Sequence, residues 1–220
     1  MKPQEQSGRG GLVIMRALVL VAFCAGMPLL LFGASGPAWW SNPSLVVSGT
    51  IPIISGSAND YAAVNEGQVK NFAITAVNEF NTDFASAGGA GPTLTSVAAS
   101  LSATSVSTND FAVVNLGQLK ALAKPYYDRL FALDYSAGPP LTSGTYPWVG
   151  GTASDYAVVN LGQIKNLFSF DPTYSSDGNP LPNWWRLYYF GTLSVSATST
   201  VTISGTTFTY LQVWEHRLAP

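Results

Sequence analysis

The sequence predicts a mainly α-helical chain, in which three short capped helices are joined by long linkers and followed by a C-terminal loop and helix segment. Three observations predict this class. One phrase containing Asn, Gly, Gln and Lys at fixed spacing occurs three times, as "NDYAAVNEGQVKNFA", "NDFAVVNLGQLKALA" and "DYAVVNLGQIKNLF". Apolar residues follow each copy at intervals of three and four, the period of an amphipathic helix. The intervening stretches are rich in Gly, Ser, Thr and Pro, which favour loops.

Residues 1–38 are expected to be a secretory signal, with Met15 as a possible true start. Arg16 precedes an apolar run (17–34) that gives way to the small residues and Pro of "SGPA", the order of a signal peptide and its cleavage site. The alternative is a membrane anchor, because the run is just long enough to span a bilayer if Pro28 is tolerated. Cleavage predicts a secreted, periplasmic or cell-surface protein. It would also remove Cys24, the only Cys, so that disulfides and Cys-ligated zinc are excluded.

The repeated phrase is interpreted as a helix start. In the first copy Asn65 stands at the N-cap and Gln68 three residues later, which is the spacing of a capping box. Val64 and Val69 flank this pair at the positions of a hydrophobic staple. The other two copies keep the capping pair as Asn115 with Gln118 and Asn160 with Gln163.

The recurring Gly stands in the first helical turn, where it costs about 1 kcal/mol relative to Ala. These residues are Gly67, Gly117 and Gly162. One interpretation is that a neighbouring element, such as the ring of Tyr61, Phe111 or Tyr156, approaches the backbone too closely for a Cβ atom. The other is an anion bound at the helix N-terminus with help from the recurring Lys. Those lysines, otherwise expected to be solvated, are Lys70, Lys120 and Lys165.

The units and their boundaries follow from these patterns. Helical units are expected at 57–84, 107–135 and 153–171, linkers at 39–56, 85–106 and 136–152, and the C-terminal segment at 172–220. The linkers are too polar for a packed element, apart from Val97, Leu101 and "YPW" (146–148). Pro125 is expected to kink or interrupt the second helix near Ala121. Because such small units cannot bury a core alone, the helices are expected to pack on one another or on a partner.

The segment "SSDGNPLPNWWRLYYFG" from Ser175, together with the three phrases, carries a family resemblance. The chain resembles exported bacterial repeat proteins of the verrucomicrobial type, in which "N-x-G-Q-L-K" helical units precede calcium loops of the thrombospondin type 3 or dockerin kind. The resemblance spans roughly residues 57–215. It implies an EF-hand-like or dockerin-like loop and helix pair and an exported location, but no activity.

The calcium ligands of that family are degenerate here. On the twelve-position pattern of such a loop, the ligand positions fall on Ser175, Asp177, Asn179, Asn183 and Arg186. Only one is a carboxylate, and Arg186 stands where a bidentate Glu belongs. A weaker second loop, starting at Thr202, has no carboxylate at its ligand positions. We therefore expect no bound metal and no other cofactor.

The remaining residues point to no catalytic chemistry. Charged residues make up 10% of the chain, with 10 Lys and Arg against 12 Asp and Glu, which excludes a basic nucleic-acid surface. His216 is a lone histidine, expected to be solvated, and the dispersed polar residues form no triad or carboxylate pair. The aromatic residues Trp184, Trp185, Tyr188 and Tyr189 are either the core of the C-terminal segment or a platform for a sugar.

The sequence thus favours a non-enzymatic structural or interaction protein of the cell envelope, of the scaffold or adhesion type. Its expected partner is an envelope protein or polysaccharide, with membrane contact only through an uncleaved signal. The alternative is a ligand-binding module, for carbohydrate through the four aromatic residues or for calcium, weakly, through the loop from Ser175 to Arg186.

Overall fold

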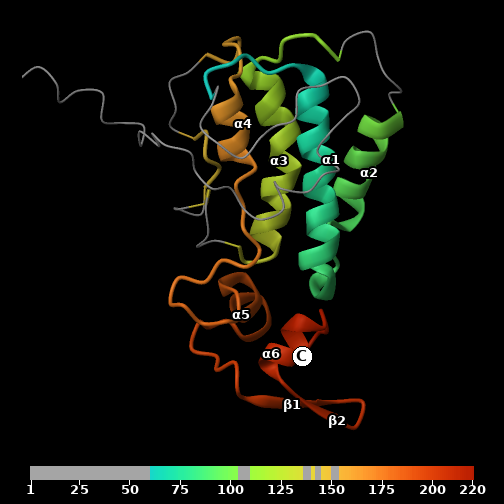
Figure 1. Cartoon of the computed structure of the whole chain (residues 1–220), viewed down its shortest axis with the longest axis vertical. Helices are drawn as coiled ribbons and strands as arrows, with labels where there is room; N and C mark the ends of the chain where they lie inside the picture. Colours follow the sequence, from blue (N-terminus) through green and yellow to red (C-terminus); the bar gives the residue numbers. More distant parts are fainter. Residues whose placement is uncertain (1–59, 104–109, 136–139, 142–144, 150–153) are drawn as a thin grey trace, which may run out of the picture. The chain divides into compact units, whose positions relative to one another are not determined.

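The structure, a computed structural model, describes residues 60–103, 110–135, 140–141, 145–149 and 154–220. The expected signal and the linker 39–56 lie outside these residues. The helices are α1 (Glu66–Asp83), the 3-10 helix η3 (Ala85–Ala87), α2 (Gly91–Ala103), α3 (Leu116–Ala132), α4 (Leu161–Leu167), α5 (Asn183–Phe190) and α6 (Tyr210–Glu215), and the strands are β1 (Thr200–Ile203) and β2 (Thr206–Thr209) (Figure 1). The described part is mainly α-helical, as the sequence predicts.

The three copies of the phrase begin α1, α3 and α4. In α1 the Asn65 side chain accepts from the Gln68 backbone N–H at 2.9 Å, and the Gln68 side chain accepts from the Asn65 N–H at 3.1 Å. The same reciprocal pair starts α3 and α4. In each of these helices the third N–H is therefore satisfied by the Asn that precedes the helix.

Helix α3 links the other two through buried tyrosines. The Tyr126 hydroxyl donates to the Ala73 carbonyl of α1, and the Tyr127 hydroxyl donates to the Leu167 carbonyl of α4, each at 2.8 Å. Phe80 and Phe168 pack against the Tyr126 ring from α1 and from the end of α4. The short helices thus bury a common core, as expected for units too small to bury a core alone.

The interpretation of 85–106 as a linker without a packed element is wrong, because α2 occupies 91–103. Leu94 is fully buried, and Val97, Ala98 and Leu101 pack against the same core. These residues fall at helical intervals. Pro92 lies in the first turn, where a missing N–H costs nothing. The Arg129 side chain of α3 donates to the carbonyls of Ala87 and Gly89 in the turn before α2.

The expected interruption at Pro125 is also absent, because α3 runs unbroken from Leu116 to Ala132. Proline removes one backbone bond and crowds the carbonyl four residues earlier, which disfavours a helix interior. Here Ala123, Tyr126, Tyr127 and Leu130 of the same helix are buried. Tertiary packing therefore holds the helix across its weakest point.

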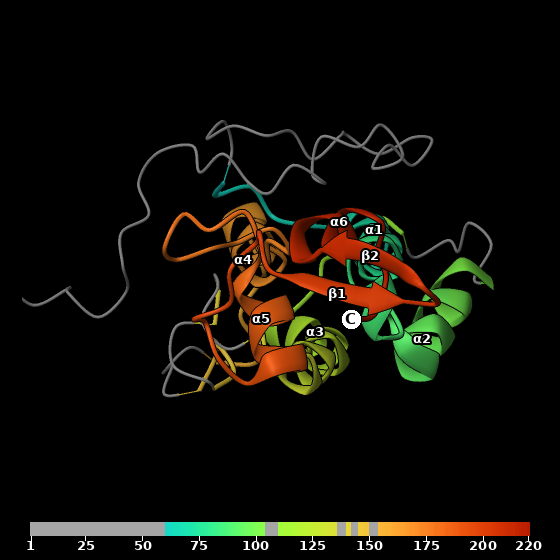
Figure 2. The same cartoon turned by 90° about the horizontal axis from the view of Figure 1, so that it is seen from below.

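The C-terminal segment contains α5, a hairpin and α6 (Figure 2). The Trp184 ring contacts Phe84 at the end of α1 and Trp214 of α6, with centroids 4.7 and 5.7 Å away. The expected second loop from Thr202 is instead the antiparallel pair of β1 and β2, with Thr202 opposite Thr207. Alternating β-branched residues and the positive φ angles of Ser204 and Gly205 favour a tight hairpin over an ion-wrapping loop.

Candidate functional site

The residues before α1, α3 and α4 form one closed arrangement, the three-copy ring, made of 60–67, 110–117 and 155–162. At its centre Val64 donates its N–H to Val159, Val159 donates to Val114, and Val114 donates back to Val64, at 3.0, 2.9 and 3.3 Å. These valines are 1%, 0% and 3% exposed. Each copy is therefore donor to one neighbour and acceptor from the other.

The first helical N–H groups are satisfied across the copies. The Gly67 N–H donates to the Asp110 carbonyl, Gly117 to Asp155, and Gly162 to Asp60, at 2.9, 2.8 and 2.8 Å. The residue before each Gly donates in the same direction, from Glu66 to Ala112, from Leu116 to Ala157 and from Leu161 to Ala62. With the third N–H taken by the Asn cap, these helix starts have no free donor to offer, so the anion interpretation of the phrase is wrong.

Close backbone approach explains the Gly, but the approaching group is an aspartate and not an aromatic ring. A Cβ atom on Gly117 would lie 3.2 Å from the Asp155 Cβ, and one on Gly162 would lie 3.2 Å from the Asp60 Cβ and 3.3 Å from its carbonyl oxygen. At these two positions glycine therefore lets the backbones of neighbouring copies approach closely at the bond between them.

The recurring Lys binds the same aspartate that the Gly approaches. Lys70 pairs with Asp110 at 2.7 Å, Lys120 with Asp155 at 2.7 Å and Lys165 with Asp60 at 2.6 Å. The expectation that these lysines are solvated is thus wrong, most clearly for Lys165, which is 7% exposed. Sequence reasoning did not assign this role to the three aspartates, although they recur with the Lys in every copy.

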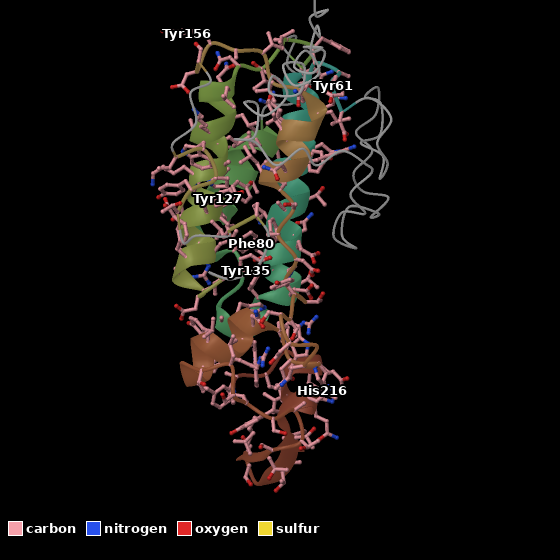
Figure 3. The ribbon with its side chains drawn as sticks, turned by 90° about the vertical axis from the view of Figure 1, so that its left-hand side faces the viewer. Tyr61, Phe80, Tyr127, Tyr135, Tyr156 and His216 are labelled. Carbon is pink, nitrogen blue, oxygen red and sulfur yellow. The ribbon has the colours of Figure 1, made fainter. Side chains whose placement is uncertain are left out.

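The outward side of the three-copy ring carries large apolar side chains, here called the aromatic face. Tyr61, Phe111 and Tyr156 are 89%, 75% and 90% exposed, and Val113 and Val158 beside them are 56% and 57% exposed. Figure 3 shows Tyr61 and Tyr156 at the end where the helices begin, whereas Phe80, Tyr127 and Tyr135 lie among the helices. The same position of each copy thus exposes an aromatic ring.

The loop from Ser175 to Arg186 is closed by its own arginine. The Arg186 guanidinium is fully buried and forms a two-pronged contact with the Asp177 carboxylate, at 2.7 and 2.8 Å. Hydrogen bonds from Arg186 and then Ser175 hold the pKa of Asp177 well below its usual range. Asn183 accepts from the same guanidinium at 2.8 Å, whereas the Asn179 side chain turns to the backbone of Leu181 and Val195.

These residues do not fit the calcium ion that the resemblance implies. One carboxylate is too little negative charge for a hard divalent ion, and its oxygens already accept from a cation. Within the ranges that the structure describes, no cluster of three or more His, Cys, Asp or Glu could hold a metal ion.

The four aromatic residues of α5 do not form a sugar platform. Trp184 and Trp185 are 1% and 0% exposed, Tyr189 is partly buried, and Tyr188 alone of the four is exposed, at 38%. The structure places the two tryptophans in the core of the C-terminal segment and packs Tyr189 against that core. His216 is exposed beside the Phe208 ring. Among the described residues no helix is both long enough and apolar enough to span a bilayer.

Comparison of the chain with known proteins finds no match: no family model, curated protein sequence or solved structure matches it.

Proposed function

We propose that this chain is an exported, non-enzymatic structural or interaction protein of the cell envelope, of the scaffold or adhesion type. In this proposal the three phrases mark helical repeat units closed into one scaffold, and the C-terminal segment is a degenerate EF-hand-like or dockerin-like loop and helix. The aromatic face is the contact surface.

The observation that carries the proposal is the exposure of Tyr61, Phe111 and Tyr156 at one position of all three copies. Large exposed apolar side chains are a feature of interaction surfaces, and aromatic residues are enriched there. The backbone beneath them is fixed by hydrogen bonds from every copy to its neighbours. A fixed base reduces the entropy lost on binding, which favours a contact role.

The chemistry of the face favours another envelope protein over a polysaccharide. Val113 and Val158 extend the apolar area around the rings. The Asp side chains of the ring pair with the Lys side chains of the helices that follow it. Apart from the hydroxyls of Tyr61 and Tyr156, such a surface offers few polar groups, so it matches an apolar protein patch better than a polysaccharide.

Photo-crosslinking tests this proposal. A benzophenone amino acid replaces Phe111 in one variant and Tyr188, an exposed aromatic residue on α5, in the control. Each is produced in the source cell and irradiated. We expect a discrete crosslinked envelope protein from position 111 but not from position 188, and its loss when Tyr61 and Tyr156 are changed to Ser. Crosslinks only to polysaccharide or to a second copy, or equal crosslinks from both positions, would overturn the proposal.

A further inference from the structure

Arg186 is an unusual residue to find in the core of the C-terminal segment. It directly follows the buried Trp184 and Trp185 on α5 and is 0% exposed. A guanidinium stays protonated at any ordinary pH, so its burial requires oxygen partners to replace water. Its surroundings therefore show what the loop provides for a positive charge.

The partners are oxygen atoms from both sides of the guanidinium. Nη1 donates to Asp177 Oδ2 at 2.8 Å and to the Leu193 carbonyl at 2.5 Å. Nη2 donates to Asp177 Oδ1 at 2.7 Å, Asn183 Oδ1 at 2.8 Å and Ser175 Oγ at 3.3 Å. We call this set of four residues the oxygen cage. Three of the four stand at loop positions that the resemblance implies for metal ligands.

We infer that Arg186 is the resident cation of this loop, and that its guanidinium fills the oxygen cage in place of a metal ion. One positive charge balances the single carboxylate of the cage, whereas a divalent ion would exceed it. A metal ion in the same cage would also lie within a few ångströms of the guanidinium, where two positive charges repel each other strongly. The segment therefore folds without a metal ion.

The cage also explains how the loop is joined to the chain that follows it. The Leu193 carbonyl accepts from Arg186, and the Val195 carbonyl accepts from the Asn179 amide at 2.9 Å. Residues 193–195 are thus held against the loop by one charged and one neutral side chain. Removal of the guanidinium should loosen both the loop and the path to β1.

Chemical rescue tests the inference on the mature chain. We expect Arg186→Ala to lower Tm by about 5 °C, as the loss of charged hydrogen bonds implies. Millimolar ethylguanidinium chloride should restore part of this loss, relative to sodium chloride at equal concentration. Neither the wild type nor Asp177→Asn/Arg186→Ala should respond. An equal response in all three proteins would overturn the inference.

Two further measurements keep the inference testable if Arg186→Ala does not fold. Arg186→Lys, which retains the charge, should lose less in Tm than Arg186→Met, which is of similar length and neutral. Equal losses would contradict a role for the charge. Wild-type Tm should be the same in millimolar calcium and in chelator, and a saturable calcium signal by calorimetry would show that the cage still takes a metal ion.

Discussion

At the scale of single residues, the same ion pair occurs three times with different burial. Lys165 and Asp60 have side chains 8% and 34% exposed, whereas Lys120 and Asp155 are 21% and 64% exposed. The distances are nearly equal, at 2.6 and 2.7 Å. Burial, not geometry, should therefore decide how much each pair contributes to stability.

Lys165→Met should destabilise the protein more than Lys120→Met. Both keep the side-chain stem and remove the charge, but the first leaves a less exposed carboxylate without its partner. We expect a loss of about 1–2 kcal/mol for Lys165→Met and under about 0.5 kcal/mol for Lys120→Met. Urea unfolding measures both. Asp60→Asn/Lys165→Met, which removes the stranded charge, should recover part of the loss, and equal losses in the two single variants would contradict the argument.

At the scale of helices, the capping pair of each phrase is encoded locally. The Asn and Gln of each phrase cap their own helix, and they do so in α1, α3 and α4 alike. Helix α6 uses the same device with Thr209 and Gln212. A cap depends on neighbours three residues away, so it can be altered without touching the core.

Asn115→Ala should cost about 1 kcal/mol, because it removes the acceptor for the Gln118 N–H. Asn115→Asp, which keeps an acceptor at the N-cap, is the matched control and should retain most of the stability. Thermal or urea unfolding measures the difference. An unchanged midpoint for Asn115→Ala would show that the cap does not contribute.

The sequence predicts local features of this protein, but not contacts between residues far apart in the chain. Caps and apolar stripes are local, so the three helix starts and their buried faces were predictable. Helix α2 was missed because its Gly and Ser content concealed the stripe from Leu94 to Leu101. The ring was not predictable, because Asp60 is ten residues before Lys70 in sequence yet pairs with Lys165, 105 residues away. The sequence showed Arg186 only as a replacement for a calcium ligand. Its role was not predictable, because the Leu193 carbonyl that it binds comes near it only in the folded chain.

At the scale of the whole molecule, charged side chains join the end of α1 to the C-terminal segment. Glu79 of α1 lies near Asp83 and Asp171, and Asp83 pairs with Arg217 beyond α6. Burial first, then a hydrogen bond and repulsion from Asp83 and repulsion from Asp171, raise the pKa of Glu79 to about 8, against the opposing effect of Arg217. The protein therefore holds a proton here that the unfolded chain releases near its ordinary pKa of 4.5.

Stability should fall as pH rises from 4.5 to 8. The folded state binds the Glu79 proton more tightly than the unfolded chain does. The stability that this proton contributes is therefore complete below the pKa of Glu79 in the unfolded chain, and it is lost as pH rises through the pKa in the folded protein. Glu79→Gln should flatten this slope, whereas Glu215→Gln, which removes an exposed carboxyl, should leave it unchanged. Urea midpoints across the range measure it, and an unaltered slope in Glu79→Gln would place the titration elsewhere.

Export is the prediction that concerns the chain as a whole. If the run 17–34 belongs to a cleaved signal, exported protein should begin between Gly36 and Trp39. Intact mass of material from the cell envelope measures this directly. A full-length product embedded in the membrane would favour the anchor instead.

The closure of the three-copy ring has a consequence for how this gene can change. Arrays of repeats ordinarily lengthen and shorten by tandem duplication and deletion, because an open array keeps neighbours on both sides of the break. Here the Gly162 N–H donates to the Asp60 carbonyl and the Lys165 side chain pairs with the Asp60 carboxylate. The third copy therefore finds its partners in the first copy. Deleting one copy would leave the donors of one remaining copy and the acceptors of the other without partners. Inserting a fourth copy would break the closed set of hydrogen bonds among the three valines. We therefore expect point mutation, rather than a change in copy number, to be the tolerated route of divergence for this gene.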